Sequence, residues 1–268
     1  MARRKMQMGV CRVCGDNKNL SFEHVPPRIA FNGNTKYLSV PFDDYVKIDN
    51  PMKTPPKGKV VQGGTGYYAL CQECNSFLGV NYVNAYERWA KAAFQVISGN
   101  QYNHFKCTIR DLEPLKILKQ IISMFLTMNN DWYGKAYPEL IEFVKDRDNG
   151  ILPDKFKVFA FLNNEGQMRF SKYTVSFTPE FGILTSSELV FPPFGYVLTI
   201  NFPNIINRMT NITNFKTYSF DQKTDLSLEF VKLPTYLPFP LDYRPKEQIE
   251  KDIEAGILAR DSMKPDSE

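Results

Sequence analysis

Two Cys-x-x-Cys pairs, set far apart in the chain, constrain the fold more than any other feature of the sequence. The first pair is Cys11 and Cys14, followed by Gly15, and the second is Cys71 and Cys74. Each pair offers two thiolate ligands from one tight turn, and a closed structural zinc site takes four such ligands in a tetrahedron. We therefore expect the four cysteines to hold one structural Zn²⁺.

Three other interpretations of the cysteines stay open at this point: two unrelated pairs, a redox pair, or disulfides. Under reducing conditions paired cysteines bind metal more often than they form disulfides. The fifth cysteine, Cys107, stands in an alternating apolar stretch and is expected to be a small buried hydrophobic residue. The span between the two pairs is longer than a simple zinc ribbon needs, so a further substructure is expected between them.

The net charge of +4 is unevenly distributed along the chain. Residues 1–110 hold 15 Lys and Arg against 7 Asp and Glu, a balance of +8, whereas residues 111–268 hold 18 against 22, a balance of −4. A basic front half favours contact with a polyanion such as nucleic acid, although chance alone can produce such an asymmetry. Arg28, Lys36 and Lys59 are candidate phosphate contacts, with ordinary solvated charges as the alternative.

Local patterns predict an α+β chain with two domains, residues 1–100 and 101–268. In the first domain Tyr82, Tyr86 and Trp89 recur at helical spacing, which favours a core face over a stacking platform. The other elements expected there are a strand at residues 20–22, a loop or small insertion over 28–58, a hairpin of residues 59–62 and 66–70 around Gly63-Gly64, and a helix starting near Cys71.

The second domain is predicted to be helical at first and then an antiparallel β-rich accessory domain. Its role would be recognition, sensing or oligomerisation, because no motif within it carries chemistry. The predicted helices cover residues 111–128, with Pro114 in the first turn, residues 137–146, and a last segment opened by Pro245; the predicted strands cover residues 157–161, 169–177, 196–202 and 226–231.

The dipeptide Glu23-His24 and the residue after the second cysteine pair, Asn75, offer the groups that a phosphodiesterase needs. A neutral imidazole can take a proton from water near pH 7. Carboxylate and amide oxygens are the ligands that Mg²⁺ prefers. Asn75 is expected in the first turn of a helix, whose positive end favours phosphate. His104 has no such neighbours and is expected to have no catalytic role.

Three segments together resemble the zinc-containing branch of the HNH endonuclease family, which has the ββα-metal fold. They are Leu20-Ser-Phe-Glu-His-Val-Pro-Pro27, the later Gly63-Gly64, and Leu70-Cys-Gln-Glu-Cys-Asn-Ser-Phe-Leu-Gly79, so the resemblance covers about residues 10–80. It implies that His24 is the general base, that Glu23 and Asn75 bind a catalytic divalent cation such as Mg²⁺, and that the cysteines hold structural zinc.

One departure from the family's pattern concerns its middle Asn, which holds the loop that orients the base. The family usually places it a few residues before the second cysteine pair, and here residues 66–70 contain no Asn. Another residue is expected to hold this loop.

The resemblance predicts a metal-dependent endonuclease that hydrolyses phosphodiester bonds in DNA, with RNA as an open alternative, in a bacterial antiviral defence or restriction role. Two alternatives are a zinc-stabilised nucleic-acid-binding module without catalysis, and an effector subunit that acts with a partner protein or as a homodimer through residues 101–268. The most apolar stretch, residues 117–128, is interrupted by Lys119 and is too short to span a bilayer, so we expect a cytoplasmic protein without membrane contact.

Overall fold

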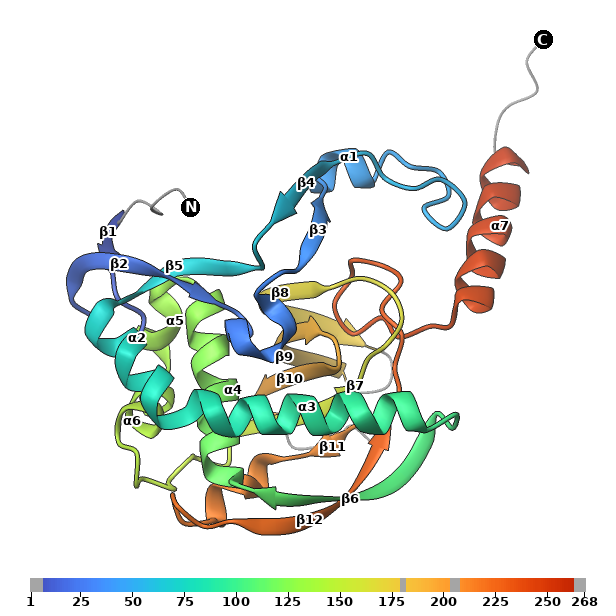
Figure 1. The fold of residues 1–268 in the computed structure, drawn as a ribbon. Coiled ribbons are helices and arrows are strands. Elements are labelled where there is room, and N and C mark those ends of the chain that lie inside the picture. The colour runs from blue at the N-terminus through green and yellow to red at the C-terminus, as the bar shows by residue number, and fades with distance from the viewer. Residues whose placement is uncertain (1–6, 179–181, 203–207, 263–268) are drawn as a thin grey trace.

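The computed structural model describes residues 7–178, 182–202 and 208–262 of this chain. Within these residues the chain has the mixed α+β architecture that the sequence predicts, and its named strands pair antiparallel. Figure 1 shows a small sheet beside a group of helices, a projecting arm, and a larger sheet crossed by one long helix.

The small sheet contains the strand that carries Glu23 and His24. Its strand order is β1-β2-β5, and the chain leaves β5 directly into a helical stretch, so the strand predicted at residues 20–22 and the helix predicted near Cys71 are both confirmed. The elements are β1 (Gln7–Val10), β2 (Asn17–His24), β5 (Gly66–Cys71), α2 (Gln72–Leu78), the irregular turn η2 (Gly79–Val83) and α3 (Asn84–Gly99).

Between β2 and β5 the chain forms a separate arm that stands above the larger sheet (Figure 1). The predicted hairpin around Gly63-Gly64 is wrong, because β4 pairs with β3 of the arm whereas β5 pairs with β2. Gly63 and Gly64 have φ values of 87° and 83°, so they turn the chain from one sheet into another. The arm consists of η1 (Arg28–Asn32), β3 (Lys36–Ser39), α1 (Phe42–Tyr45) and β4 (Lys59–Gln62).

The second half places a group of helices beside a five-stranded sheet of order β11-β7-β10-β9-β8, and a separate two-stranded sheet pairs β12 with β6. Strands β6 and β9 have no counterpart in the sequence prediction. The elements are β6 (His104–Leu112), α4 (Pro114–Met128), α5 (Asp131–Ala136), α6 (Pro138–Lys145), β7 (Phe156–Leu162), β8 (Arg169–Thr178), β9 (Gly182–Phe191), β10 (Phe194–Ile200), β11 (Thr210–Asn211), η3 (Thr213–Thr217), β12 (Thr224–Val231) and α7 (Lys246–Ser262).

One hydrophobic core joins the two halves. The indole of Trp89 stacks on Phe194 with ring centroids 4.7 Å apart, and its Nε1 donates a hydrogen bond to the Tyr196 hydroxyl at 2.9 Å. Tyr82, Tyr86 and Trp89 are all buried, which agrees with the interpretation of their spacing as a core face. The division at residue 100 stays a prediction, since this core runs across it.

Helix α4 is buried along almost its whole length. Its lysine, Lys119, donates hydrogen bonds to the carbonyl oxygens of Phe143, Asp146 and Asn149 near the C-terminal end of α6. Those acceptors explain how a charged residue is tolerated in an apolar helix. Among the residues that the structure describes, no helix has the length and apolar character needed to cross a bilayer.

Candidate active site and metal centre

The four paired cysteines meet at one point of the small sheet. Cys11 and Cys14 lie in the turn between β1 and β2, whereas Cys71 ends β5 and Cys74 lies in the first turn of α2. Their Sγ atoms all lie within 4.8 Å of one another, and the Cys14 and Cys71 sulfurs are 3.9 Å apart. A tetrahedron with zinc–sulfur bonds of about 2.3 Å has sulfur–sulfur edges of about 3.8 Å. The geometry therefore fits a four-coordinate ion, and the cluster can bind a metal such as zinc.

The protonation of this cluster shows how strongly the thiols interact. A hydrogen bond from Cys74 lowers the pKa of Cys11 to about 4, and the same interaction raises the pKa of Cys74. Burial raises the pKa of Cys71 to about 11. Several thiolates this close together need a cation, which is what a zinc ligand set requires.

Glu23 and Asn75 come together on one face of β2. The Asn75 side chain donates a hydrogen bond to the Ser21 hydroxyl at 2.9 Å, and Ser21 in turn donates to the carbonyl of Leu70 at 3.1 Å. Glu23 lies on the same face as Ser21, two residues further along the strand. Burial raises the pKa of the Glu23 carboxyl to about 7, while its interaction with the Asn75 side chain works in the opposite direction. A half-buried carboxyl of β2 thus lies beside the side-chain amide of Asn75 in α2.

His24 leaves the opposite face of the same strand. Its ring packs edge-on against Phe22, with centroids 5.1 Å apart, and its Nε2 lies 3.1 Å from the carbonyl oxygen of Gly63. A carbonyl only accepts hydrogen bonds, so Nε2 is the donor. In the neutral ring the lone pair then lies on Nδ1, which is the protonation state that a general base requires.

Asn32 is the residue of this site that the sequence does not reveal. It is fully buried in η1, and its side-chain amide donates hydrogen bonds to the carbonyls of Pro26 at 2.7 Å and Thr65 at 2.8 Å. Its Oδ1 accepts a hydrogen bond from the Thr65 backbone at 2.8 Å. Asn32 thereby joins the segment after His24 to the segment after Gly63. It holds the loop beside His24 that an Asn within residues 66–70 would hold in the sequence pattern described above.

Gly64 shows how tightly this loop is packed. A Cβ atom added there would lie 2.0 Å from the Asn32 carbonyl oxygen and 3.0 Å from Cδ2 of His24. The position therefore needs glycine for space as well as for its positive φ. The sequence does carry a signal at this position, the Gly-Gly dipeptide.

The candidate phosphate contacts are all exposed, on or beside the arm. Arg28 begins η1, Lys36 lies in β3 and Lys59 in β4. His104 lies away from this group in β6 and its Nε2 is 2.5 Å from a Glu229 carboxylate oxygen. Cys107 is partly buried in the same strand, less deeply than the sequence suggested.

Comparison with protein-family models, with characterised proteins and with solved structures finds no match to this chain. The interpretation of the site therefore depends on its own residues and geometry.

Proposed function

We propose that this chain is a metal-dependent endonuclease of the HNH type, built on a ββα-metal module formed by β2, β5 and α2. The observation that carries the proposal is the side-by-side placement of Glu23 and Asn75 on one face of β2, with His24 as the next residue at the end of the same strand and a cysteine cluster with the geometry of a structural zinc site at the start of α2. A protein that only binds nucleic acid has no need of this catalytic combination.

In the proposed reaction His24 accepts a proton from a water molecule, and the resulting hydroxide forms a new bond to the phosphorus of a phosphodiester. The bond from phosphorus to the 3′ oxygen breaks, and that oxygen leaves and takes up a proton from solvent. The hydrogen bond to the Gly63 carbonyl keeps the imidazole in the tautomer that can accept this proton. Asn32 is the positioning residue, because it fixes the loop on which Gly63 lies.

Glu23 and Asn75 would hold the catalytic divalent cation, which supplies charge neutralisation at the phosphate when bound. Two protein oxygens suit Mg²⁺, which keeps several waters and takes further ligands from substrate phosphates. Asn75 is the fourth residue of helix α2, so its side chain is held one turn from the start of the helix, close to Cys74. The four cysteines would bind structural Zn²⁺ and fix the distance between β2 and α2.

The direct test is incubation of the zinc-loaded protein with supercoiled plasmid DNA, and in parallel with RNA, in Mg²⁺, Mn²⁺ or Ni²⁺. The proposal predicts nicked and linear DNA that depends on the added cation. Binding without cleavage under every cation would instead support a zinc-stabilised nucleic-acid-binding module.

A further inference from the structure

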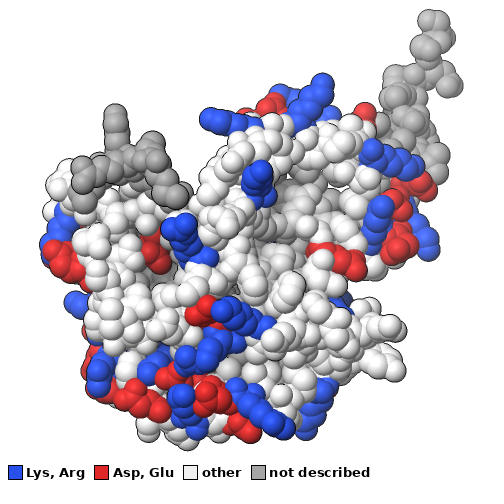
Figure 2. Space-filling model, viewed as in Figure 1, with Lys and Arg blue, Asp and Glu red and all other residues white. Residues whose placement is uncertain are grey.

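A large cleft lies between the arm and the edge of the five-stranded sheet. It has a volume of about 850 Å³, within the usual size range of ligand sites. The arm contributes Tyr37, Leu38 and Phe42 to one wall, and the sheet edge contributes Gln167 and Phe170 to the other. In Figure 2 the surface beneath the projecting arm is hollowed and mainly uncharged, with Lys and Arg side chains on the arm above it.

The cleft reaches the strand β5, which pairs with the strand that carries Glu23 and His24. Its floor includes Gly66 and Tyr67 of β5. In the sheet, Gly66 pairs with His24 and Tyr67 pairs with Glu23. The cleft is therefore lined by the cross-strand neighbours of the two residues on which the proposed chemistry depends.

The lining and the rim differ in character. Among the described residues that line the cleft, none carries a charge, and aromatic rings from the arm, β5 and β8 are prominent. The exposed side chains of Lys36 and Lys59 lie on the two strands of the arm. Aromatic surfaces in a cleft beside the exposed cations of the arm match a strand with stackable bases and an anionic backbone.

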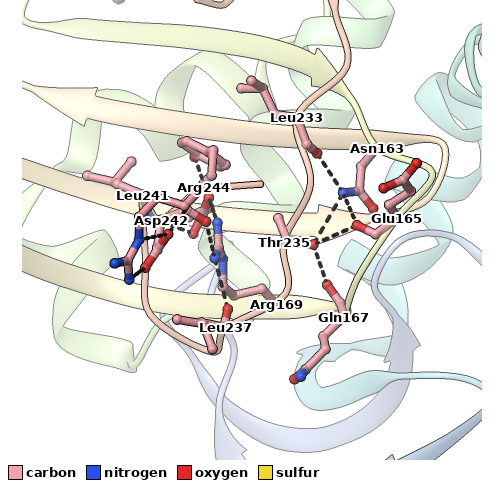
Figure 3. Close-up of polar contacts among 12 residues, drawn as sticks. Asn163, Glu165, Gln167, Arg169, Leu233, Thr235, Leu237, Leu241, Asp242 and Arg244 are labelled. Carbon is pink, nitrogen blue, oxygen red and sulfur yellow. Dashed lines mark hydrogen bonds and ion pairs between the residues drawn. The ribbon is translucent and has the colours of Figure 1, made fainter. Parts of the chain in front are cut away.

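The sheet-side wall is held by buried polar contacts (Figure 3). Arg169 forms a buried ion pair with Glu188 at 2.7 Å, and its other terminal nitrogen donates to the carbonyls of Leu237 and Asp242. The Gln167 side chain donates to the carbonyl of Tyr236. These bonds fasten the segment around Pro238, which also lines the cleft, so the wall is formed before any ligand arrives.

We infer that this cleft binds unpaired nucleobases of the strand that Glu23 and His24 would cut, so that the preferred substrate is single-stranded or locally unpaired nucleic acid. The inference rests on the proposed function. Base faces are available for stacking only where the bases are unpaired, and a duplex presents its phosphates instead.

The test measures binding by fluorescence anisotropy, with no added divalent cation and in the His24→Ala background so that the probe stays intact. The probes are a short fluorescein-labelled oligothymidylate, the corresponding oligouridylate, and the DNA strand annealed to its complement. Phe42→Ala is the cleft variant, because its 59 % exposed side chain can be removed without opening the core. Phe177→Ala is the matched control, since it is an exposed Phe eight residues beyond the start of β8.

The expected result is tighter binding of the single strand than of the duplex, with Phe42→Ala weakening single-strand binding about tenfold and Phe177→Ala leaving it unchanged. The two single-stranded probes distinguish DNA from RNA. Equal or tighter binding of the duplex, or a Phe42→Ala variant that binds the single strand as tightly as the parent, would overturn the inference.

Failure of the cleft and failure of the proposed function give different results. If the protein cuts plasmid but Phe42→Ala does not weaken single-strand binding, the proposed nuclease function stands and the inference about the cleft fails. If single-strand binding depends on Phe42 but the protein cuts nothing under any cation, the proposed nuclease function fails. The cleft is then a binding site of a non-catalytic protein.

Discussion

Asn32 and Thr65, which are 33 residues apart in the chain, are joined by two hydrogen bonds of 2.8 Å between the Asn side chain and the Thr backbone. A third contact, from the Thr65 hydroxyl to Asn32 Oδ1, is 3.4 Å long. Because Thr65 follows Gly63-Gly64, this pair connects the two ends of the arm beside His24. The arm can therefore project from the body while the loop that orients the base stays fixed.

Replacing this side chain should affect both the fold and the site. Asn32→Ala removes the amide and leaves buried backbone groups of Pro26 and Thr65 without partners, so the free energy of unfolding should fall by about 2–4 kcal/mol. Under conditions where the variant stays folded, cleavage should still decrease, because His24 loses the fixed position of Gly63. Urea denaturation and plasmid cleavage measure the two effects. Asn34→Ala, an exposed Asn two residues away, is the control and should change neither.

The close packing around Gly64 predicts that a methyl group added at this position destabilises the same loop. Gly64→Ala places a methyl group against Asn32 and strains a backbone with φ of 83°, so stability should fall by at least about 2 kcal/mol. Gly182→Ala is a matched control, because Gly182 has φ of 70° and open space around its Cβ position. Its cost should stay near about 1 kcal/mol. Equal losses would show that the contact with Asn32 has no effect.

The cysteine cluster predicts that the zinc content of the protein depends on its four cysteines and not on Cys107. The full chain should purify with one Zn²⁺ per molecule, and Cys74→Ser should lose most of it together with the thermal stability of the small sheet. Cys107→Ser is the matched control, since Cys107 lies in β6 outside the cluster and should leave the zinc content unchanged. Elemental analysis with thermal denaturation provides both values. A Cys74→Ser variant with full zinc content would contradict the four-cysteine assignment.

The raised pKa of Glu23 predicts how the protein responds to pH. Without metal, the folded carboxyl ionises near pH 7 because it is buried, whereas an unfolded Glu ionises near 4.5. The unfolded chain therefore releases its proton first, so this group's stabilising contribution is present below about pH 4.5 and is lost as the pH rises to about 7.

Binding of the catalytic cation should have the opposite dependence, because the cation requires the carboxylate. Mn²⁺ affinity, measured by calorimetry on zinc-loaded His24→Ala protein, should rise about tenfold per pH unit below 7 and level off above it. Glu23→Gln should bind more weakly and lose this slope. A slope that persists in Glu23→Gln would assign the titration to another group.

The buried ion pair behind the cleft predicts that substitutions of two arginines have different effects on the free energy of unfolding. Arg169→Met leaves the carboxylate of Glu188 buried without its cation, and the expected loss is about 3–5 kcal/mol. Arg244→Met is the comparison: its side chain is 43 % exposed and pairs with Asp252, which is exposed, and with Asp242, which is largely buried, so its loss should be smaller than that of Arg169→Met. Chemical denaturation at neutral pH compares the two variants.

The parts of this molecule that the sequence predicts are those encoded locally. The cysteine spacing predicts the turn at Cys11 and the helix at Cys71, and the helical recurrence of Tyr82, Tyr86 and Trp89 predicts a core face. In each case one element's own pattern carries the information, because a turn or a helix face is defined by residues within a few positions of one another.

The parts that the sequence does not predict depend on contacts between distant segments. Strands β4 and β5 follow each other in the chain, and adjacency favours a hairpin, but the arm gives β4 a partner in β3 and leaves β5 to β2. Asn32 lies in a segment whose composition indicates a loop. Its importance arises only when Thr65 is folded against it, and no periodicity marks such a contact.

The measurement that tests the account most directly is plasmid cleavage by His24→Ala, with zinc content determined on the same samples. The account predicts that cleavage is lost while the protein stays folded and its zinc content equals that of the parent chain, because His24 acts on water and does not belong to the cysteine cluster. A His24→Ala protein that contains full zinc and cuts DNA at the parental rate would contradict it.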